Sequence, residues 1–195
     1  MTYYDENAET FIRDTLSVDM SAVMDRFLEH LPDEGRVMDA GCGSGRDIRS
    51  FLEKGFQVTA FDASAEMVKN ASHFSGIDVR HAAFCDLSDE QKYDGIWCCA
   101  SLLHVRAADF TDAVSRLYRA LKPGGVIYLS FKYGAGERVS GGRYFLDHTE
   151  ESLAADLRFL PELKVVSMWK TADARPHRKN DFWLNAIVRD RKSVV

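Results

Sequence analysis

The sequence predicts an α/β fold: a seven-stranded, mostly parallel sheet with helices on both faces and an antiparallel last strand. Strand-like apolar runs alternate with helical patterns, which is typical of a parallel sheet that is covered on both faces. The first such strand leads into a turn with three glycines in five residues, GCGSG. The last two runs, LKVVSMW and FWLNAIVRD, have no helix between them, so the final strand, around residues 182–190, is expected to be antiparallel.

The elements follow one another in a regular order. Helical spacing of apolar residues predicts a helix over residues 20–31, after a shorter helical segment with Phe11 and Ile12 facing inward. Ser64 is a candidate N-cap for a later helix. Between the helices, five further segments are predicted strands: RVMDAG (36–41), FQVTAFD (56–62), DVRHAAF (78–84), YDGIWCCAS (93–101) and VIYLSF (126–131).

Composition sets the class of protein. A chain of 195 residues with 46% apolar and 28% charged residues is typical of one globular domain. The amino-terminal segment has neither a basic nor an apolar region of a signal peptide, so a cytoplasmic location is expected, without a membrane span. The net charge of -5 argues against a nucleic-acid partner. The four cysteines form no C-x-x-C pair, so no metal site is expected.

The glycine turn indicates the kind of ligand. A strand, a glycine turn and a helix together present free backbone N–H groups and a helix N-terminus. The dinucleotide fingerprint G-x-G-x-x-G would need a small residue at position 46, where this chain has Arg46. A carboxylate, Asp39, precedes the first glycine, and it suits a ligand that carries an ammonium group.

The segment VMDAGCGSG resembles the first motif of class I S-adenosylmethionine-dependent methyltransferases, and the resemblance covers residues 35–132. Further segments match this family in order: Asp62 after the second strand, CDL (85–87), YDGIWCCASLLHV (93–105), LKPGGVIYLSF (121–131) and the closing hairpin. The GCGSGRD wording is similar to small cytosolic members, including those related to tellurite resistance. The resemblance implies a Rossmann-like fold, S-adenosylmethionine as cofactor, and methyl transfer.

The resemblance also implies a division of the chain and a set of cofactor contacts. Residues 1–34 would form a helical lid, 35–132 the cofactor-binding half and 133–195 the substrate-side half of a single domain. The expected cofactor contacts are Asp39, Gly41, Gly43, Gly45, Arg46, Asp62, Ala63, Met67, Asp86 and Leu87, with Tyr4, beside Tyr3, from the lid.

Individual roles follow from the resemblance, with structural alternatives. Asp62 would bind the ribose hydroxyls, and Asp86 and the Leu87 N–H would bind the adenine. Met67 would lie against the adenine face, or else belong to the core. Arg46 would pair with the cofactor carboxylate, or else form a surface ion pair. Asp39 would otherwise cap backbone N–H groups.

His104 follows the fourth strand, at the edge where open parallel sheets bind substrate, so it is a candidate general base. A structural histidine is the alternative. The segments 132–143 and 170–180 carry seven Lys and Arg residues and two acidic residues, a net charge of 7 - 2 = +5. The glycines of the segment 132–143 suggest a mobile lid.

Together the two segments would form a positively charged cavity entrance, the basic mouth, which suits a small anionic acceptor. The alternative is a pair of solvated loops. The expected substrate contacts are Lys132, Arg143, Arg175 and His177, with Trp183 nearby. The predicted function is therefore methyl transfer to a small anionic molecule by a monomer or homodimer. Open alternatives are a non-catalytic cofactor-binding regulatory domain, an NAD-binding oxidoreductase and an RNA methyltransferase.

Overall fold

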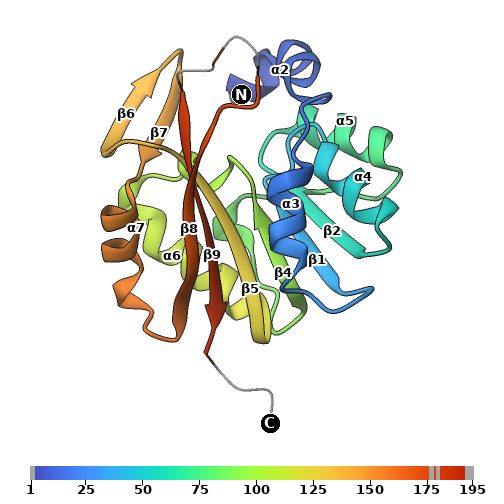
Figure 1. The fold of residues 1–195 in the computed structure, drawn as a ribbon. Coiled ribbons are helices and arrows are strands. Elements are labelled where there is room, and N and C mark those ends of the chain that lie inside the picture. Colours follow the sequence, from blue (N-terminus) through green and yellow to red (C-terminus); the bar gives the residue numbers. More distant parts are fainter. Residues whose placement is uncertain (1–2, 176–177, 179–180, 192–195) are drawn as a thin grey trace.

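A computed structural model describes residues 3–175, 178 and 181–191 (Figure 1). These residues form a seven-stranded sheet with the order β3-β2-β1-β4-β5-β9-β8 and a two-stranded ribbon, β6-β7. The strands of the large sheet are β1 (Arg36–Ala40), β2 (Gln57–Asp62), β3 (Arg80–His81), β4 (Tyr93–Cys98), β5 (Leu121–Lys132), β8 (Leu163–Ala172) and β9 (Phe182–Asp190).

The direction of the last strand confirms the prediction. Strands β1 to β5 pair in parallel, whereas β9 pairs antiparallel with both β5 and β8. β8 is therefore parallel to the first five strands, and β9 alone runs the other way in this sheet. The six parallel strands point to one edge, at the top of Figure 1. This carboxyl edge is where open α/β sheets bind ligands.

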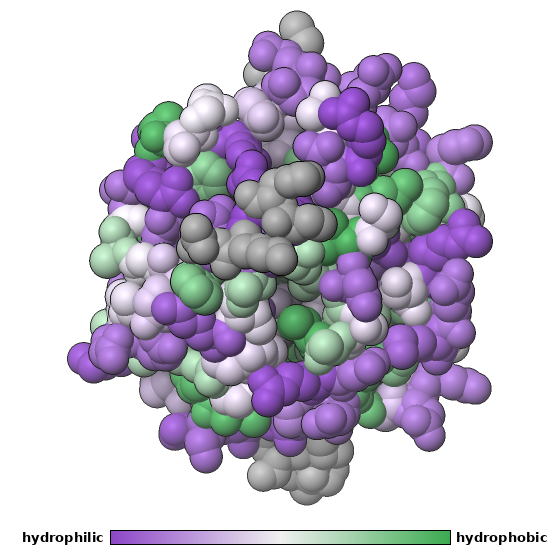
Figure 2. Space-filling view, turned by 45° about the horizontal axis from the view of Figure 1, so that its top comes forward, coloured by the Kyte–Doolittle hydropathy of each residue, from purple (hydrophilic) through white to green (hydrophobic). Residues whose placement is uncertain are grey.

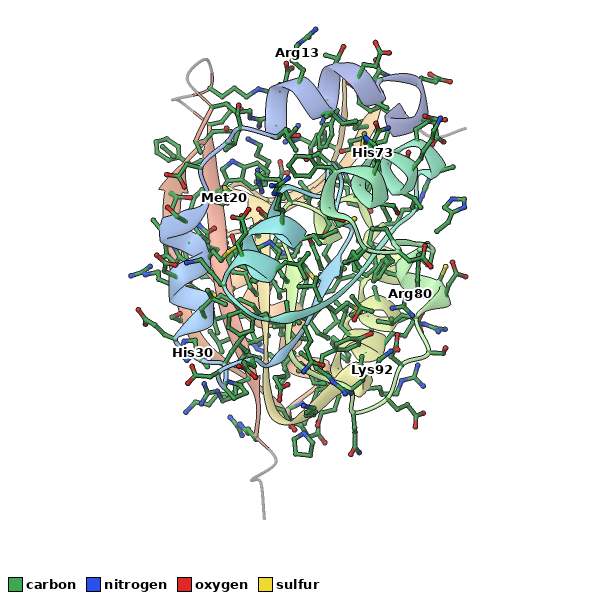
Figure 3. All side chains as sticks on the ribbon, turned by 90° about the vertical axis from the view of Figure 1, so that its right-hand side faces the viewer. Arg13, Met20, His30, His73, Arg80 and Lys92 are labelled. Carbon is green, nitrogen blue, oxygen red and sulfur yellow. The ribbon has the colours of Figure 1, made fainter. Side chains whose placement is uncertain are left out.

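Helices cover both faces of the sheet. α3 (Ser21–Leu28), α4 (Arg46–Glu53) and α5 (Ala65–Ser75) lie on one face, and α6 (Ala107–Ala120) and α7 (Glu150–Asp156) lie on the other (Figures 1 and 3). Neighbouring strand residues point to opposite faces. Ile96 packs in the cluster that contains Leu117 of α6, and the next residue, Trp97, packs against Phe27 of α3. The alternation of strands and helices thus buries two apolar layers.

The helix that follows β2 begins as predicted. The Ser64 hydroxyl accepts a hydrogen bond from the Met67 N–H at 3.3 Å, which satisfies one of the free donors at the start of α5. Two short helices, α1 (Tyr3–Glu6) and α2 (Ala8–Thr15), precede α3 and lie at the carboxyl edge of the sheet (Figure 1). Single turns occur at η1 (Phe84–Asp86), η2 (Leu102–His104) and η3 (Leu157–Phe159). No helix of the described residues is long and apolar enough to cross a membrane.

The segment after β5 forms a hairpin rather than an irregular loop, and its role as a mobile lid stays a prediction. It contains β6 (Gly136–Ser140) and β7 (Arg143–Asp147), which form an antiparallel hairpin. Ser140 pairs with Arg143, and the two turn residues, Gly141 and Gly142, have φ values of 54° and 74°. Two positive φ angles are what a type I′ hairpin turn requires. These glycines therefore specify a tight turn.

Candidate active site

A cavity of about 750 Å³ lies at the carboxyl edge of the parallel strands. Seen with this side of the molecule turned forward, the surface is mostly hydrophilic, and hydrophobic side chains are visible between the hydrophilic ones (Figure 2). Most of the predicted site residues line this cavity: Tyr4, Asp39, Gly41, Gly43, Arg46, Asp62, Ala63, Met67, His104, Lys132, Arg143 and Arg175. The structure thus brings together residues from both halves of the chain.

The glycine turn joins β1 to α4. All three glycines have positive φ angles, 78° at Gly41, 53° at Gly43 and 80° at Gly45. A Cβ on Gly41 would lie 2.5 Å from the Cβ of Ser101, and one on Gly45 would lie 3.0 Å from the backbone of Ala71. Gly41 and Gly43 line the cavity, whereas Gly45 serves the close approach of α4 to α5. Both the backbone conformation and the packing therefore require glycine here.

Asp39, near the end of β1, is a buried carboxylate that lines the cavity. Within the described part of the chain, its Oδ2 atom has no hydrogen-bond partner. Burial, together with the negative charge of Asp47, raises the pKa of Asp39 well above its ordinary value. A buried oxygen without a partner is costly, so this position is suited to a cationic or hydrogen-bond-donating ligand group.

Asp62 ends β2 beside the turn. Its Oδ2 accepts the N–H of Gly43 at 2.8 Å, and its Oδ1 accepts the N–H of Ser64 at 2.9 Å. Burial raises the pKa of Asp62, although these two N–H groups act to lower it. Each carboxylate oxygen keeps a second lone pair, so Asp62 can also accept from ligand hydroxyls.

Arg46 begins α4 and forms an ion pair that is largely buried, not the surface ion pair that was the alternative to its cofactor role. Its Nε and Nη2 atoms lie 2.6 and 2.8 Å from the two oxygens of Asp47, which also accepts the Trp97 indole N–H at 2.9 Å. The Nη1 atom is directed to the Thr15 carbonyl oxygen at 3.4 Å. Sequence reasoning missed Asp47, although it follows Arg46 directly. The guanidinium still lines the cavity, and its contact with a cofactor stays a prediction.

The segment expected at the adenine lies differently. Asp86 is exposed, and its carboxylate accepts the Ala83 N–H at 2.9 Å. The Leu87 N–H donates to the carbonyl oxygen of Phe84 at 3.3 Å. Neither Asp86 nor Leu87 lines the cavity, whereas Phe84 and Cys85 do, together with Met67. The adenine role of Asp86 and Leu87 stays a prediction that this geometry does not support.

His104 has hydrogen-bond partners for both ring nitrogens. Its Nδ1 lies 2.7 Å from the carbonyl oxygen of Tyr144, which can only accept, so Nδ1 carries the proton. Nε2 therefore accepts the hydroxyl of Tyr4, also at 2.7 Å. Burial lowers the pKa of His104 to about 4. The ring is neutral at pH 7, and Tyr4 from the first helix lies on the acceptor side of the cavity.

Ion pairs neutralise part of the predicted basic mouth. The buried carboxylate of Asp173 accepts from Lys132 at 2.9 Å, from Arg175 at 2.6 and 2.8 Å, and from the Trp183 indole N–H at 3.0 Å. Burial alone would raise the pKa of Asp173, but the hydrogen bonds from Arg175 and Lys132 outweigh it and hold this pKa well below its usual value. Lys132 also lies 3.3 Å from Asp181.

Two further cations of these segments have partners. Arg138 pairs with Asp147, and Arg178 lies 3.9 Å from Asp181. Asp147 and Asp181 lie outside the two segments that were counted, and with them the balance falls from +5 to 7 - 4 = +3. His177 and Lys179 lie outside the described residues.

Arg143, at the start of β7, differs from these cations. Among the described residues no carboxylate pairs with it, and its Nε is buried without a hydrogen-bond partner. The guanidinium carbon lies 5.0 Å from the ring centre of Tyr3 and 5.1 Å from that of Phe145. Hydrogen bonding from Arg143 lowers the pKa of Tyr4, and the charge of Arg143 lowers the pKa of His104, although burial dominates at each. The described part of the cavity wall therefore contains one half-buried guanidinium without a carboxylate partner.

Comparisons with known proteins show similarity to methyltransferases. Residues 37–125 match a family described as a methyltransferase domain. The chain is 34% identical over 147 residues to a malonyl-[acyl-carrier protein] O-methyltransferase of Enterobacter lignolyticus, covering 73% of this chain and 47% of that protein. It is 40% identical over 106 residues to a ubiquinone biosynthesis O-methyltransferase of Xanthomonas axonopodis pv. citri, covering 51% and 44%. The chain thus spans less than half the length of these two relatives.

A solved structure extends the similarity over almost the whole chain. The 1,6-didemethyltoxoflavin-N1-methyltransferase of Burkholderia thailandensis, with bound 1,6-didemethyltoxoflavin and S-adenosylhomocysteine, superimposes with a TM-score of 0.75 at 25% identity. This match covers 96% of this chain and 83% of that one. The similarity to tellurite-resistance-related members stays an expectation. The chain belongs to the class I S-adenosylmethionine-dependent methyltransferase family.

Proposed function

We propose that this protein transfers the methyl group of S-adenosylmethionine to a small anionic acceptor. The observation that carries the proposal is Arg143, a guanidinium in the cavity whose Nε is buried and unpartnered among the described residues. Burial of a donor without a partner is costly, so such a group is expected to meet an anion when the site is filled.

The cofactor side of the cavity fits S-adenosylmethionine. The unpartnered oxygen of Asp39 would accept from the ammonium group, and Asp62 would accept from the ribose hydroxyls. Gly41 and Gly43 leave room for close approach of the ligand to the backbone, since neither has a side chain. When bound, the cofactor supplies a methyl group on a positively charged sulfur. The tight turn and the two carboxylates would hold that group in a fixed direction.

The acceptor side argues for an ion rather than for a neutral alcohol. A neutral hydroxyl needs a base, and His104 is a weak one, because burial lowers its pKa to about 4 and its Nε2 already accepts from Tyr4. An acceptor that arrives ionised needs no base. The chain then has only to align the anion and exclude water. Two curated relatives are O-methyltransferases, which supports oxygen as the methylated atom.

The first test measures ligand binding. S-adenosylhomocysteine at one hundred times its dissociation constant is expected to stabilise the protein by about 2.7 kcal/mol, and NAD is expected to have no effect. Asp62→Ala is expected to weaken S-adenosylhomocysteine by about 1.5–3 kcal/mol in calorimetry. Stabilisation by NAD instead would contradict the proposal.

The second test measures turnover. Cell extract supplies acceptors and is first separated on an anion exchanger. Radiolabelled S-adenosylmethionine is then expected to label small molecules from the fraction that the exchanger retained. Label in cationic amines or in RNA would contradict the anionic acceptor. Cofactor binding without any transfer of label would instead indicate a regulatory domain.

A further inference from the structure

Four groups on the acceptor side of the cavity form a chain of hydrogen bonds. Burial raises the pKa of Tyr4, and a hydrogen bond that Arg143 donates to its hydroxyl acts to lower it. The same hydroxyl lies 2.7 Å from Nε2 of His104, and Nδ1 of this ring lies 2.7 Å from the carbonyl oxygen of Tyr144. The chain thus begins and ends at neighbouring residues of β7 and passes through α1 and η2 between them.

The two ends of this chain fix the direction of every bond in it. A guanidinium can only donate, and a backbone carbonyl oxygen can only accept. His104 therefore carries its proton on Nδ1, and the Tyr4 hydroxyl donates its one proton to Nε2. The lone pairs of the Tyr4 oxygen are then left to accept from Arg143. Because each group has a single role, the position of Arg143 depends on Tyr4.

Aromatic side chains restrict the same two residues. The ring of Tyr4 packs edge-on against Phe11, with the ring centres 5.1 Å apart. The guanidinium carbon of Arg143 lies 5.0 Å from the ring centre of Tyr3 and 5.1 Å from that of Phe145. Its Nε stays without a hydrogen-bond partner in the described part of the chain. A donor that is held in place loses less conformational freedom when a ligand binds.

We propose that Tyr4 is a positioning residue of the acceptor site, whose hydroxyl holds Arg143 where the anionic group of the acceptor binds. The inference rests on the proposed function and adds a residue of α1 to its acceptor site. The resemblance to methyltransferases predicted a cofactor contact for Tyr4 instead. The two roles differ in what loss of the hydroxyl would weaken, the acceptor or the cofactor.

Kinetics and calorimetry separate these two roles. With saturating radiolabelled S-adenosylmethionine, the exchanger-retained fraction of cell extract is varied to find the amount that gives half the maximal transfer of label. Tyr4→Phe keeps the ring and removes the hydroxyl. It is expected to raise this amount at least fivefold, with a maximal rate within threefold and an S-adenosylhomocysteine affinity within twofold of wild type. A weaker S-adenosylhomocysteine affinity with an unchanged half-saturating amount would overturn the proposal.

Tyr133→Phe is the matched control for this change. The Tyr133 hydroxyl bonds to Glu150 at 3.0 Å, and Tyr133 does not line the cavity. This variant should match wild type in the half-saturating amount, the maximal rate and the S-adenosylhomocysteine affinity. An equal rise of the half-saturating amount in both tyrosine variants would contradict a specific role of Tyr4.

A double-mutant cycle tests whether Tyr4 acts through Arg143. Arg143→Gln alone is expected to raise the half-saturating amount at least tenfold. Adding Tyr4→Phe to Arg143→Gln should change this amount less than twofold, because the hydroxyl then has no guanidinium to hold. If the two losses multiply in the double variant, Tyr4 does not act through Arg143 and the proposal is wrong.

Chemical modification follows Arg143 without any acceptor. Phenylglyoxal reacts with accessible guanidinium groups, and mass spectrometry gives the rate at each arginine. Arg143 is expected to react at least fivefold faster in Tyr4→Phe than in wild type, whereas exposed Arg106 keeps its rate. An unchanged rate at Arg143, or an equal rise at Arg106, would overturn the proposal. Absence of label transfer by the wild-type protein would instead refute the proposed function, and the modification rates would still decide whether Tyr4 holds Arg143.

Discussion

Asp39 and Asp62 are both carboxylates at strand ends, but they differ in hydrogen bonding and therefore in their effect on folding stability. Both oxygens of Asp62 accept backbone N–H groups, whereas one oxygen of Asp39 is buried without a partner among the described residues. Asp39 thus lowers the stability of the ligand-free protein, because burial favours its neutral form. Such a site lowers the folding stability of the ligand-free protein and favours the binding of a cationic group.

Asp39→Asn is therefore expected to have opposite effects on stability and binding. The folded-state pKa of Asp39 lies above its unfolded value of 3.8, so the wild-type protein loses stability as the pH rises through the raised pKa. The asparagine variant does not titrate, and its melting temperature at pH 8 should equal or exceed that of wild type. Its affinity for S-adenosylhomocysteine should fall by about 1.5–3 kcal/mol. A lower melting temperature with unchanged affinity would show that Asp39 is only a structural cap.

His104 gives a pH dependence of the opposite sign. Its folded-state pKa of about 4 lies below the unfolded value of 6.5, so the unfolded chain takes up a proton first as the pH falls. Stability from this group is complete above pH 6.5 and is lost between pH 6.5 and 4, by at most roughly 3 kcal/mol. Urea unfolding at pH 7 and pH 5 should show this loss in wild type and a smaller one in His104→Gln. His73→Gln, an exposed histidine on α5, is the control and should behave as wild type.

At the scale of elements, the spacing of apolar residues predicted the buried helices and strands, but the residues of exposed segments did not predict their structure. The glycine turn, α3 and the antiparallel β9 were predictable, because apolar spacing records which side of each element is buried. The β6-β7 hairpin was not, because every residue of β6 is exposed and no alternation marks it. Its glycines were therefore assigned to a loop, whereas Gly141 and Gly142 form the turn of a hairpin.

The same limit applies to the site. Asp39, Asp62 and His104 lie where strand ends place them, so the sequence was enough to put them in the cavity. The ion pair between Lys132 and Asp173 joins residues 41 positions apart, and a count of charges in one segment cannot reveal it. Asp86 does not line the cavity, because η1 turns its carboxylate back to the Ala83 N–H, a local bond that competes with ligand contact; its adenine role stays a prediction.

The glycine turn offers a matched test of packing against backbone strain. Gly41 and Gly55 both have positive φ, 78° and 88°, but a Cβ would meet Ser101 at 2.5 Å from Gly41 and nothing within 4 Å from Gly55. Gly55→Ala is expected to cost about 1 kcal/mol of unfolding free energy and to leave S-adenosylhomocysteine binding unchanged. Gly41→Ala should cost at least about twice as much and abolish binding. Equal costs in urea unfolding would mean that the contact with Ser101 relaxes freely.

At the scale of the whole molecule, residues of α1 and α2 line part of the cavity. The Tyr4 hydroxyl bonds to His104, and the Ser64 hydroxyl donates to Asp5 at 2.6 Å. α1 therefore connects the acceptor side of the cavity with the ribose side, beside Asp62. In α1 and α2 together only Ala8 is buried, so these helices contribute little to the core. This arrangement supports the proposal that residues 1–34 include a lid.

Removal of residues 1–16 is expected to leave the fold intact, because the three apolar clusters are built from later residues. S-adenosylhomocysteine should dissociate at least tenfold faster, since α1 and α2 no longer cover the cavity. Stopped-flow fluorescence measures this rate. Arg13→Ala, on an exposed position of α2 (Figure 3), is the control and should dissociate at the wild-type rate. Unchanged dissociation after truncation would show that the helices do not restrict ligand exit.

The position of α1 also bears on how the protein is handled at the bench. An affinity tag fused before residue 1 would begin two residues from Tyr3, the first residue of α1. β9, by contrast, ends at Asp190 near the start of β5, at the opposite edge of the sheet (Figure 1). A tag after residue 195 is therefore the suitable choice for kinetic work, and a fluorophore attached at the amino terminus becomes a direct reporter of ligand exchange.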